Sequence, residues 1–381
     1  MPPNSTLPDS QALLDAVLGG FHALLLENGD GITHDPVRGK QRAEIPAACL
    51  FALCATGRHD APEAEQCRRL LLCLRNREGL WDEMAYGPDD EAVGFYGLVT
   101  TAYAVLALAR RAAAANDRTD IPALVAACDA IYGTENDGTL VKAAHNRSAV
   151  LNTNLLGAQA LMAVAHMLPQ ASNRRRMYTG LAERVIRRAL GYQSPRGFFP
   201  YHFESLAVPI LYQAMVTAQL RQLLHYFPQP VLRLAVRQGG RALRSVFNAS
   251  GDILWDRANN HDKRGAMWAH TFALAALDGD DGLLPAICEK LSASMRDGLF
   301  VGVEGATQPD PFYSAWMSFG LVWSLEKPAL GLVVSPGLML RRAWLLVEYW
   351  CTALSFVGAY ALHRLRAWVF PCGTLENRRW K

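Results

Sequence analysis

Apolar residues recur at helical spacing along most of the chain, at intervals of three and four residues that fall on one face of a helix. The pattern predicts twelve helices of two alternating kinds. Helices of the first kind are amphipathic and often rich in arginine, and they cover 9–27, 62–76, 119–132, 173–192, 229–247 and 282–296. Helices of the second kind are apolar on nearly every side, which is typical of helices surrounded by other helices. They cover 44–57, 93–114, 147–168, 206–226, 262–277 and 310–325. No strand pattern interrupts them.

The connectors between these helices fall into two classes. Those that lead from a helix of the first kind to one of the second are long and polar, with a recurring Gly-x-aromatic element at 75–81, 193–199, 250–255 and 295–300. Those that lead back are short and turn-like. The alternation has a period of roughly 50–60 residues, which indicates a repeat architecture. If the apolar helices form an inner ring, all long connectors lie on one face. We therefore predict an all-α fold, an (α/α)6 toroid of six outer/inner helix pairs.

The toroid is predicted to occupy 1–328, and 329–381 forms a C-terminal helical extension. Within it, 343–362 is a mainly apolar run with basic residues on both sides. Its length and flanks suit a helix that spans or lies on a membrane, whereas Glu348 favours a helix packed against the toroid. Both interpretations stay open at this point, and 339–370 is the region predicted to contact a membrane surface.

Composition bounds the remaining possibilities. The chain is 51% hydrophobic and 19% charged with a formal net charge of +3, which disfavours nucleic acid as a partner. Its eight cysteines lie mostly in apolar helical runs without CxxC spacing, so we expect reduced, buried thiols and neither a metal site nor another cofactor. The N-terminus has no basic segment followed by an apolar core, so we expect a cytoplasmic protein, peripheral at the inner membrane if the extension contacts lipid.

Polar and aromatic residues gather at the predicted N-terminal ends of the inner helices. In a toroid these ends face one mouth, where unpaired N–H groups and the positive end of the helix dipole favour hydroxyl-rich or anionic ligands. Aromatic faces stack on sugar rings while amides and carboxylates bond hydroxyls, so the pattern predicts a carbohydrate site. The predicted substrate-binding residues are Trp81, Tyr86, Asn146, Asn152, Asn154, Tyr201, Tyr212, Gln213, Trp255, Trp268, Asp310 and Trp316.

Two of these residues, Asn152 and Asn154, lie inside the apolar helix 147–168. A buried amide is costly unless it is hydrogen-bonded. The two amides therefore either bridge neighbouring inner helices or bind a ligand.

Acid–base chemistry at this mouth has two sets of candidates. Hydrolysis of a glycosidic bond needs two carboxyl groups about 5–10 Å apart, and loops on opposite sides of the ring offer Asp82, Glu83, Asp256 and Asp262. A lyase or an epimerase needs a base and an acid beside a sugar C–H. The candidates for these roles are His145, His202, His270 and Tyr313. For each of them the alternative is a solvated loop residue or a hydrogen-bonded residue of the pore.

The Gly-x-aromatic connectors, each followed by an inner helix such as T-T-A-Y-A-V-L-A-L-A at 100–109, resemble the repeats of terpenoid cyclases and other α/α toroids. The resemblance covers about 9–325 and leaves the chemistry open, since glycosidases, lyases and sugar epimerases share the layout. Asp278-Gly279-Asp280-Asp281 matches the D-x-D-D acid motif of class II terpenoid cyclases. It follows the inner helix 262–277 instead of opening one, so we interpret it as a turn.

A second resemblance rests on H-N-x5-N-x-N-L-L-G-A and, some forty residues later, Q-x-x-x-G-F-F-P-Y-H-F. This text is similar to a family of bacterial exopolysaccharide-biosynthesis proteins. The matching residues are His145, Asn146, Asn152, Asn154, Gly157, Gln193, Gly197, Tyr201 and His202. The resemblance implies a glycan-related role and identifies no reaction.

The sequence therefore supports three hypotheses. The leading one is a toroid that binds or modifies carbohydrate in bacterial polysaccharide biosynthesis, as a lyase, epimerase or hydrolase. The second is a terpenoid-cyclase-like enzyme that acts on an isoprenoid, favoured if aromatic residues and an acid line the cavity. The third is a non-catalytic assembly partner. Phosphate-binding loops, a G-x-S-x-G elbow and H-E-x-x-H are absent from the sequence, so nucleotide, α/β-hydrolase and zinc-protease chemistry have no support.

Overall fold

The computed structural model describes residues 9–28, 34–35, 40–76, 78–81, 97–140, 150–203, 208–254, 266–279, 282–301 and 307–330. Six amphipathic helices form the outer layer: α1 (Ser10–Asn28), α3 (Pro62–Cys73), α5 (Ile121–Gly133), α7 (Asn173–Gly191), α9 (Pro230–Arg244) and α11 (Leu283–Ala293). Six apolar helices form the inner layer: α2 (Glu44–Ala55), α4 (Leu98–Ala114), α6 (Leu151–Met167), α8 (Ile210–Leu223), α10 (Ala266–Ala276) and α12 (Pro311–Leu325). The predicted all-α toroid and its pairing are confirmed in the described residues.

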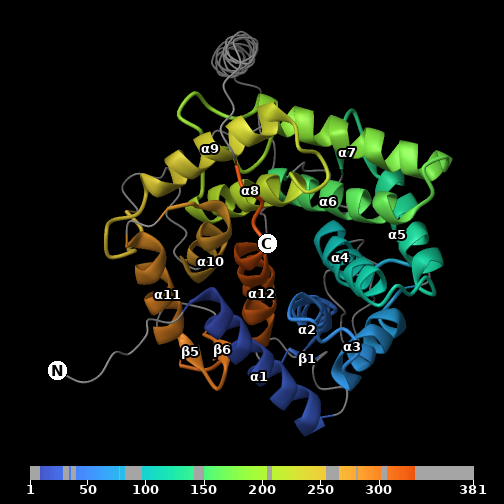
Figure 1. The fold of residues 1–381 in the computed structure, drawn as a ribbon, viewed down its shortest axis with the longest axis horizontal. Helices are drawn as coiled ribbons and strands as arrows, with labels where there is room; N and C mark the ends of the chain where they lie inside the picture. The colour runs from blue at the N-terminus through green and yellow to red at the C-terminus, as the bar shows by residue number, and fades with distance from the viewer. Residues whose placement is uncertain are drawn as a thin grey trace, which may run out of the picture. The chain divides into compact units, whose positions relative to one another are not determined.

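The inner helices close a ring (Figure 1). Each of them packs against the next in chain order, from α2 to α12, and α12 packs back against α2. The outer helices then cover the inner ones, for example α3 on α2, α7 on α6 and α9 on α8. Because the inner helices alternate with outer helices along the chain, they all run in the same direction along the axis of the ring. Their N-terminal ends therefore share one face, which we call the mouth.

Burial explains the two compositions. Every residue of α6 from Leu151 to Ala165 is buried, since neighbours surround this helix on all sides. In α9, by contrast, the buried residues fall on one face, and arginines occupy the other. Small residues let the helices approach closely: a Cβ added to Gly239 of α9 would lie 2.8 Å from the hydroxyl oxygen of Thr217 in α8. The alternation of apolar and amphipathic helices is thus the direct cause of the two layers.

The connectors contain three short antiparallel hairpins, which the sequence pattern did not predict. They pair His34–Asp35 with Lys40–Gln41 (β1, β2), Glu135–Asn136 with Thr139–Leu140 (β3, β4), and Met295–Arg296 with Leu299–Phe300 (β5, β6). In the last two hairpins an Asp-Gly pair takes positive φ, 50° and 74° at Asp137 and Gly138, and 50° and 78° at Asp297 and Gly298. Asp-Gly is a strong signal for such tight turns, and strands of two residues are too short to show alternation.

The structure explains sterically why the Gly-x-aromatic element needs glycine at position 197. Its φ is +92°, and a Cβ at this position would lie 2.2 Å from the backbone oxygen of Gln238 in α9. Only glycine accepts this conformation and this close approach together. At Gly197 and Gly298 the element thus packs the connector against an outer helix, and the aromatic residues that follow, Phe199 and Phe300, are buried.

Among the described residues, no helix combines the length and the apolar character needed to cross a membrane. The apolar run 343–362 lies outside the described residues, as does nearly all of the extension 329–381. Its contact with a membrane stays a prediction.

Candidate functional site at the mouth of the inner ring

The N-terminal halves of α10 and α12 bring three aromatic side chains together at the mouth. The ring of Trp268 stacks on Tyr313, with centroids 4.4 Å apart and planes at 24°, and on Trp316, at 5.0 Å and 15°. All three side chains are partly exposed. We call these residues the aromatic platform. The indole Nε1 atoms of Trp268 and Trp316 are buried and have no hydrogen-bond partner within the described part of the chain.

The platform continues into the pore through Tyr103 of α4, whose ring lies 5.4 Å from that of Trp316. Tyr103 is fully buried and its hydroxyl has no partner among the described residues. Burial raises the pKa of Tyr103, and the charge of Glu44 raises it further. On the outer side, the guanidinium of Arg42 lies 4.2 Å from the ring centre of Phe312. The mouth therefore combines aromatic faces with donors that are ready to bond a ligand.

Glu44 is an acidic residue of this site that sequence analysis did not single out. It is the first residue of α2, is 1% exposed and accepts a 2.7 Å hydrogen bond from the hydroxyl of Thr100. A carboxylate is stabilised at a helix N-terminus by the dipole. The signal in the sequence was a charged residue that opens an otherwise apolar inner helix. A buried carboxyl group beside an aromatic surface can act as an acid, a base or a hydroxyl acceptor.

Asp310 caps α12 at the same mouth. Its Oδ1 accepts the backbone N–H groups of Phe312 at 3.0 Å and Tyr313 at 3.1 Å, which satisfies two of the free donors of the helix. The carboxylate is 4% exposed. Asp310 therefore fixes the start of the helix that carries Tyr313 and Trp316, and so it orients the platform.

A second aromatic group lies at the start of α8, next to α10 in the ring. The ring of Tyr201 is 4.1 Å from that of His202 and 4.2 Å from that of Tyr212. The connector that carries Tyr201 crosses the start of α6, where its carbonyl accepts the N–H of Leu151 at 3.1 Å. Tyr201, His202 and Tyr212 are all partly exposed, so three of the predicted site residues do come together at the mouth.

Other predicted site residues are built into the framework instead. In the first turn of most inner helices, or just beyond it, a polar side chain bonds the backbone of the preceding connector. Asn154 donates to Leu140 O at 3.0 Å and accepts from Leu140 N at 2.6 Å. Gln213 accepts from Phe199 N at 2.7 Å. We call such residues connector anchors, and they are Thr101, Asn154, Gln213, His270 and Ser314.

Trp81 also belongs to the framework. It is fully buried, and its indole donates a 2.7 Å hydrogen bond to Leu71 O. Its backbone N–H and C=O are both bonded to the hydroxyl of Thr101. The substrate contact predicted for Trp81, Asn154 and Gln213 is corrected accordingly: these side chains hold the connectors in place and their polar groups are occupied by protein.

His270, predicted as a catalytic residue, is likewise an anchor. Its Nδ1 lies 2.7 Å from Ala266 O, and its Nε2 lies 2.7 Å from Gly251 O. Both ring nitrogens therefore face backbone carbonyls, and neither is available to a substrate. Burial lowers the pKa of His270, and this effect outweighs the two carbonyls, which favour the protonated ring.

The lowered pKa of His270 predicts a loss of stability in acid. The unfolded chain takes up this proton near pH 6.5 and the folded chain only at lower pH, so the stabilisation is complete above pH 6.5 and is lost as the pH falls through the folded pKa. We expect the free energy of unfolding to fall by up to about 1.4 kcal/mol per pH unit in this window. Urea titrations between pH 7.5 and 5 test this. His270→Gln should flatten the slope and the control His22→Gln should not; equal slopes in all three proteins would contradict it.

Two further buried amides have atoms that bond to no described residue. Asn152 of α6 is 3% exposed and its Oδ1 is unbonded, and Gln219 of α8 is fully buried with both amide atoms unbonded to any described residue. Gln219 lies two turns after Tyr212 on the same helix face. A buried amide without a partner marks a place for water or a ligand. Asn152 thus stays a candidate for ligand binding, and Gln219 joins it.

Several predicted residues lie outside the described part of the chain, and their roles stay predictions. They are Asp82, Tyr86, His145, Asn146, Trp255, Asp256 and Asp262. In contrast, Asp278 of the D-x-D-D motif lies within the described residues. Its carboxylate forms an ion pair with Arg221 at 2.6 Å, just after the C-terminal end of α10. This position, away from the mouth, agrees with the interpretation as a turn.

The thiols of the described cysteines are free, and those of Cys49, Cys54, Cys67, Cys128 and Cys288 are buried. Burial raises the pKa of Cys54 to about 12 and that of Cys288 to about 11. Both thiols are therefore protonated and unreactive at neutral pH.

Comparison of whole structures finds this fold in known enzymes. An α-amylase from Clostridium perfringens is similar at a TM-score of 0.61 with 12% identity, over 86% of this chain and 100% of that one. Rex8A from Paenibacillus barcinonensis, in complex with xylose, gives 0.58 with 9% identity over 85% and 96%. A type II terpene cyclase from Scytonema gives 0.52 with 16% identity over 83% and 98%. The sequence matches no family model and no curated protein. At these identities the likeness establishes the toroid fold and leaves the activity open.

Proposed function

We propose that this protein binds and modifies a carbohydrate at the mouth of its inner ring. The observation that carries the proposal is the aromatic platform of Trp268, Tyr313 and Trp316, with two buried indole N–H groups that have no partner among the described residues. Flat aromatic faces pack on the C–H faces of sugar rings, and N–H donors bond ring hydroxyls. Proteins of similar fold include an α-amylase and Rex8A in complex with xylose, which supports the same class of ligand.

The chemistry that fits the mouth is acid–base chemistry on a sugar. Glu44 is a buried carboxyl group whose charge acts on Tyr103, and Tyr103 contacts the platform through Trp316. His202 and Tyr313 are partly exposed groups able to transfer a proton. A lyase, epimerase or hydrolase needs two such groups on opposite sides of one bond. We propose Asp82 and Asp256 as the loop carboxyl groups that supply the second acid or base. A role in bacterial polysaccharide biosynthesis, in the cytoplasm or at the inner membrane, is part of the proposal and rests on the sequence resemblance.

Removal of the central indole tests this proposal. We expect Trp268→Ala to weaken binding of a bound oligosaccharide at least tenfold, because a stacked aromatic pair and an N–H donor are lost together. Isothermal titration of the full chain with xylo-, manno- and malto-oligosaccharides measures it. The matched control is Tyr178→Phe, which changes a buried aromatic side chain of the outer helix α7 and lies in neither ligand site. Equal affinities in the wild type and in Trp268→Ala would refute the mouth as the site.

An isoprenoid cyclase is the second candidate, and one observation favours it. The charge of Glu44 acts on the buried Tyr103, whose ring lies 5.4 Å from that of Trp316. Aromatic rings of this kind stabilise positive charge. The same titration with geranylgeranyl-bearing substrates separates the two. Binding of isoprenoids without binding of sugars, lost in Glu44→Gln, would replace the carbohydrate proposal. If neither oligosaccharides nor isoprenoids bind, the result would favour a non-catalytic assembly partner.

A further inference from the structure

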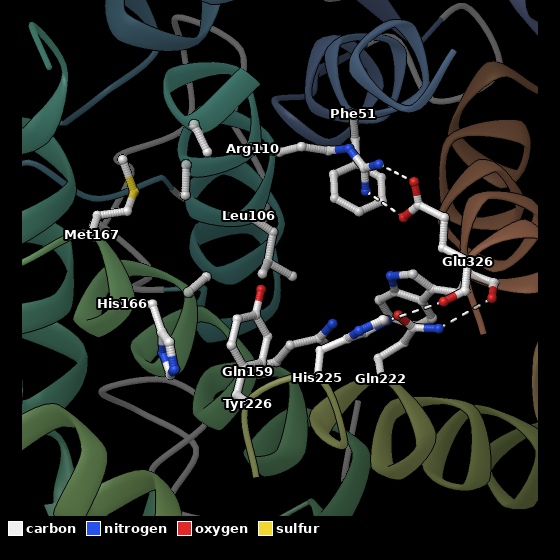
Figure 2. Close-up of a pocket in the computed structure, with 14 residues that line it drawn as sticks. Phe51, Leu106, Arg110, Gln159, His166, Met167, Gln222, His225, Tyr226 and Glu326 are labelled. Carbon is white, nitrogen blue, oxygen red and sulfur yellow. Dashed lines mark hydrogen bonds and ion pairs between the residues drawn. The ribbon is translucent and has the colours of Figure 1, made fainter. Parts of the chain in front are cut away.

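A cavity of about 350 Å³ opens at the opposite end of the inner ring from the mouth (Figure 2). Its walls are the C-terminal turns of α4, α6, α8 and α12. Leu106 and Arg110 of α4, Gln159 and His166 of α6, and Tyr226 after α8 are among the residues that line it. None of the site residues predicted from the sequence lies here.

Buried aromatic rings separate this cavity from the mouth. Tyr103 lies 4.1 Å from Phe319, and Phe319 lies 4.7 Å from Phe51, centre to centre. All three rings are buried, Tyr103 completely. Tyr103 contacts the platform through Trp316, whereas Phe51 lines the cavity. The two ends of the ring are thus distinct compartments, and a ligand of one does not occupy the other.

The cavity contains polar groups that the fold leaves unbonded. Gln159 is 4% exposed and its Oε1 has no partner within the described part of the chain. The indole Nε1 of Trp323, which is 1% exposed, is also unbonded there. Figure 2 shows the hydroxyl of Tyr226 directed into the space between these walls. A buried amide without a partner costs stability, so its presence here calls for water or a ligand.

The charges at the rim are already compensated. The guanidinium of Arg110 makes a two-pronged ion pair with the carboxylate of Glu326 (Figure 2). His166 Nδ1 lies 2.9 Å from Met162 O and His225 Nε2 lies 3.0 Å from Glu326 O. Arg110 and Glu326 thus neutralise each other, and the groups left to meet a ligand include the amide oxygen of Gln159, the indole N–H of Trp323 and the hydroxyl of Tyr226.

We infer that this cavity is a second ligand site and that its ligand is a neutral, hydroxyl-rich molecule of one or two sugar rings. A hydroxyl group both donates and accepts, so a polyol satisfies the amide of Gln159 and the N–H of Trp323 together. Tyr226 and Trp323 offer aromatic faces to its C–H groups. A cation would be repelled by Arg110, and an anion would have to displace Glu326 from it. The volume lies at the low end for small-molecule pockets. The inference stands independently of the function proposed for the mouth.

Two substitutions in the cavity test the inference, with the mouth variant Trp268→Ala as a matched control. Gln159→Leu keeps the shape and removes the amide, and Ala163→Phe fills the space from α6. The probes are methyl glycosides of glucose, mannose and xylose, together with maltose and xylobiose, followed by saturation-transfer NMR and titration on the full chain. For the binding step at the cavity we expect at least tenfold weaker affinity of one probe in Gln159→Leu and no binding in Ala163→Phe. The same step should be unchanged in Trp268→Ala, in which only binding at the mouth is weakened.

Thermal unfolding of the ligand-free protein gives a second readout that separates a ligand-binding amide from a structural one. We expect Gln159→Leu to raise the melting temperature by about 2–4 °C, because it removes an unbonded buried amide. A lower melting temperature would show that Gln159 supports the fold and would overturn the inference. Probe binding unaffected by both cavity variants, or no binding of any probe, would also overturn it. Loss of binding only in Trp268→Ala would leave the mouth proposal standing and refute the second site.

Discussion

Asn154→Leu should lower the free energy of unfolding by about 3–4 kcal/mol, because this one amide satisfies three backbone groups in the core. It accepts the N–H of Leu140 at 2.6 Å and donates to the carbonyls of Leu140 and Val150, each at 3.0 Å. Leucine has similar volume and no polar atom. The substitution therefore leaves the N–H and C=O of Leu140 in β4 buried without partners, and each such group costs about 1–3 kcal/mol. Val150 O keeps the backbone N–H of residue 154 as its partner.

Urea denaturation of the variant beside the wild type measures this effect. Ser314→Ala is the matched control, because Ser314 is the equivalent anchor of α12 and accepts only one connector N–H, that of Phe300 at 2.9 Å. We expect it to cost about 1–2 kcal/mol. If Asn154→Leu costs no more than Ser314→Ala, the anchor interpretation fails and Asn154 returns to the set of ligand-binding candidates.

The architecture could be predicted because the periodicity of apolar residues within each single helix indicates whether that helix is inner or outer. An inner helix such as α6 is apolar on all sides because it packs against α4, α5, α7 and α8, and an outer helix such as α9 is apolar on one face. The layer of each helix can therefore be predicted from its own sequence, without knowing which helices it contacts. The hairpin β3–β4 escaped prediction because two-residue strands carry no period, although its Asp-Gly turn was present in the sequence.

The candidate site could be predicted only in part, since polar residues at the start of an inner helix serve two purposes. Tyr212 and Gln213 are adjacent in the sequence, yet Tyr212 is partly exposed at the mouth while Gln213 bonds the backbone of Phe199 and Gly197. Neighbours on a helix point in directions 100° apart, so one faces the pore and the next faces the connector. Which of them faces which way depends on the rotation of the helix, and an all-apolar helix gives no sequence signal for that.

The cavity at the opposite end of the inner ring from the mouth could not be predicted from the sequence, for a related reason. Gln159 and Tyr226 are far apart in the chain and lie in helical runs without a motif. Only the closure of the ring brings α4, α6, α8 and α12 to one end and leaves an unbonded amide beside an unbonded indole. The contact between Phe51 and Phe319 further depends on ring closure, which brings α2 against α12, and Tyr103 of α4 meets Phe319 although α4 and α12 are not neighbours in the ring.

Arg221→Met is expected to cost about 3–4 kcal/mol, through the loss of hydrogen bonds that hold the chain after α12. The side chain of Arg221 is 2% exposed. It donates to Pro328 O from Nε at 3.1 Å and from Nη2 at 2.9 Å, to Ala276 O at 3.3 Å, and to Asp278 at 2.6 Å. Methionine fills much of the volume but donates nothing, so two buried carbonyls lose their partner.

The segment that Arg221 holds, 326–330, also carries Glu326, whose carboxylate and carbonyl form the rim of the cavity. The variant should therefore become sensitive to proteolysis near residue 328 as well as less stable in urea. Asp278→Asn is the control: Asp278 is half exposed, so its ion pair with Arg221 contributes only about 1 kcal/mol or less. Because the carbonyl bonds survive in Asp278→Asn, this variant should keep the segment protected. Equal losses in both variants would mean that the charge of Arg221, and not its bonds to the backbone, stabilises this end of the ring.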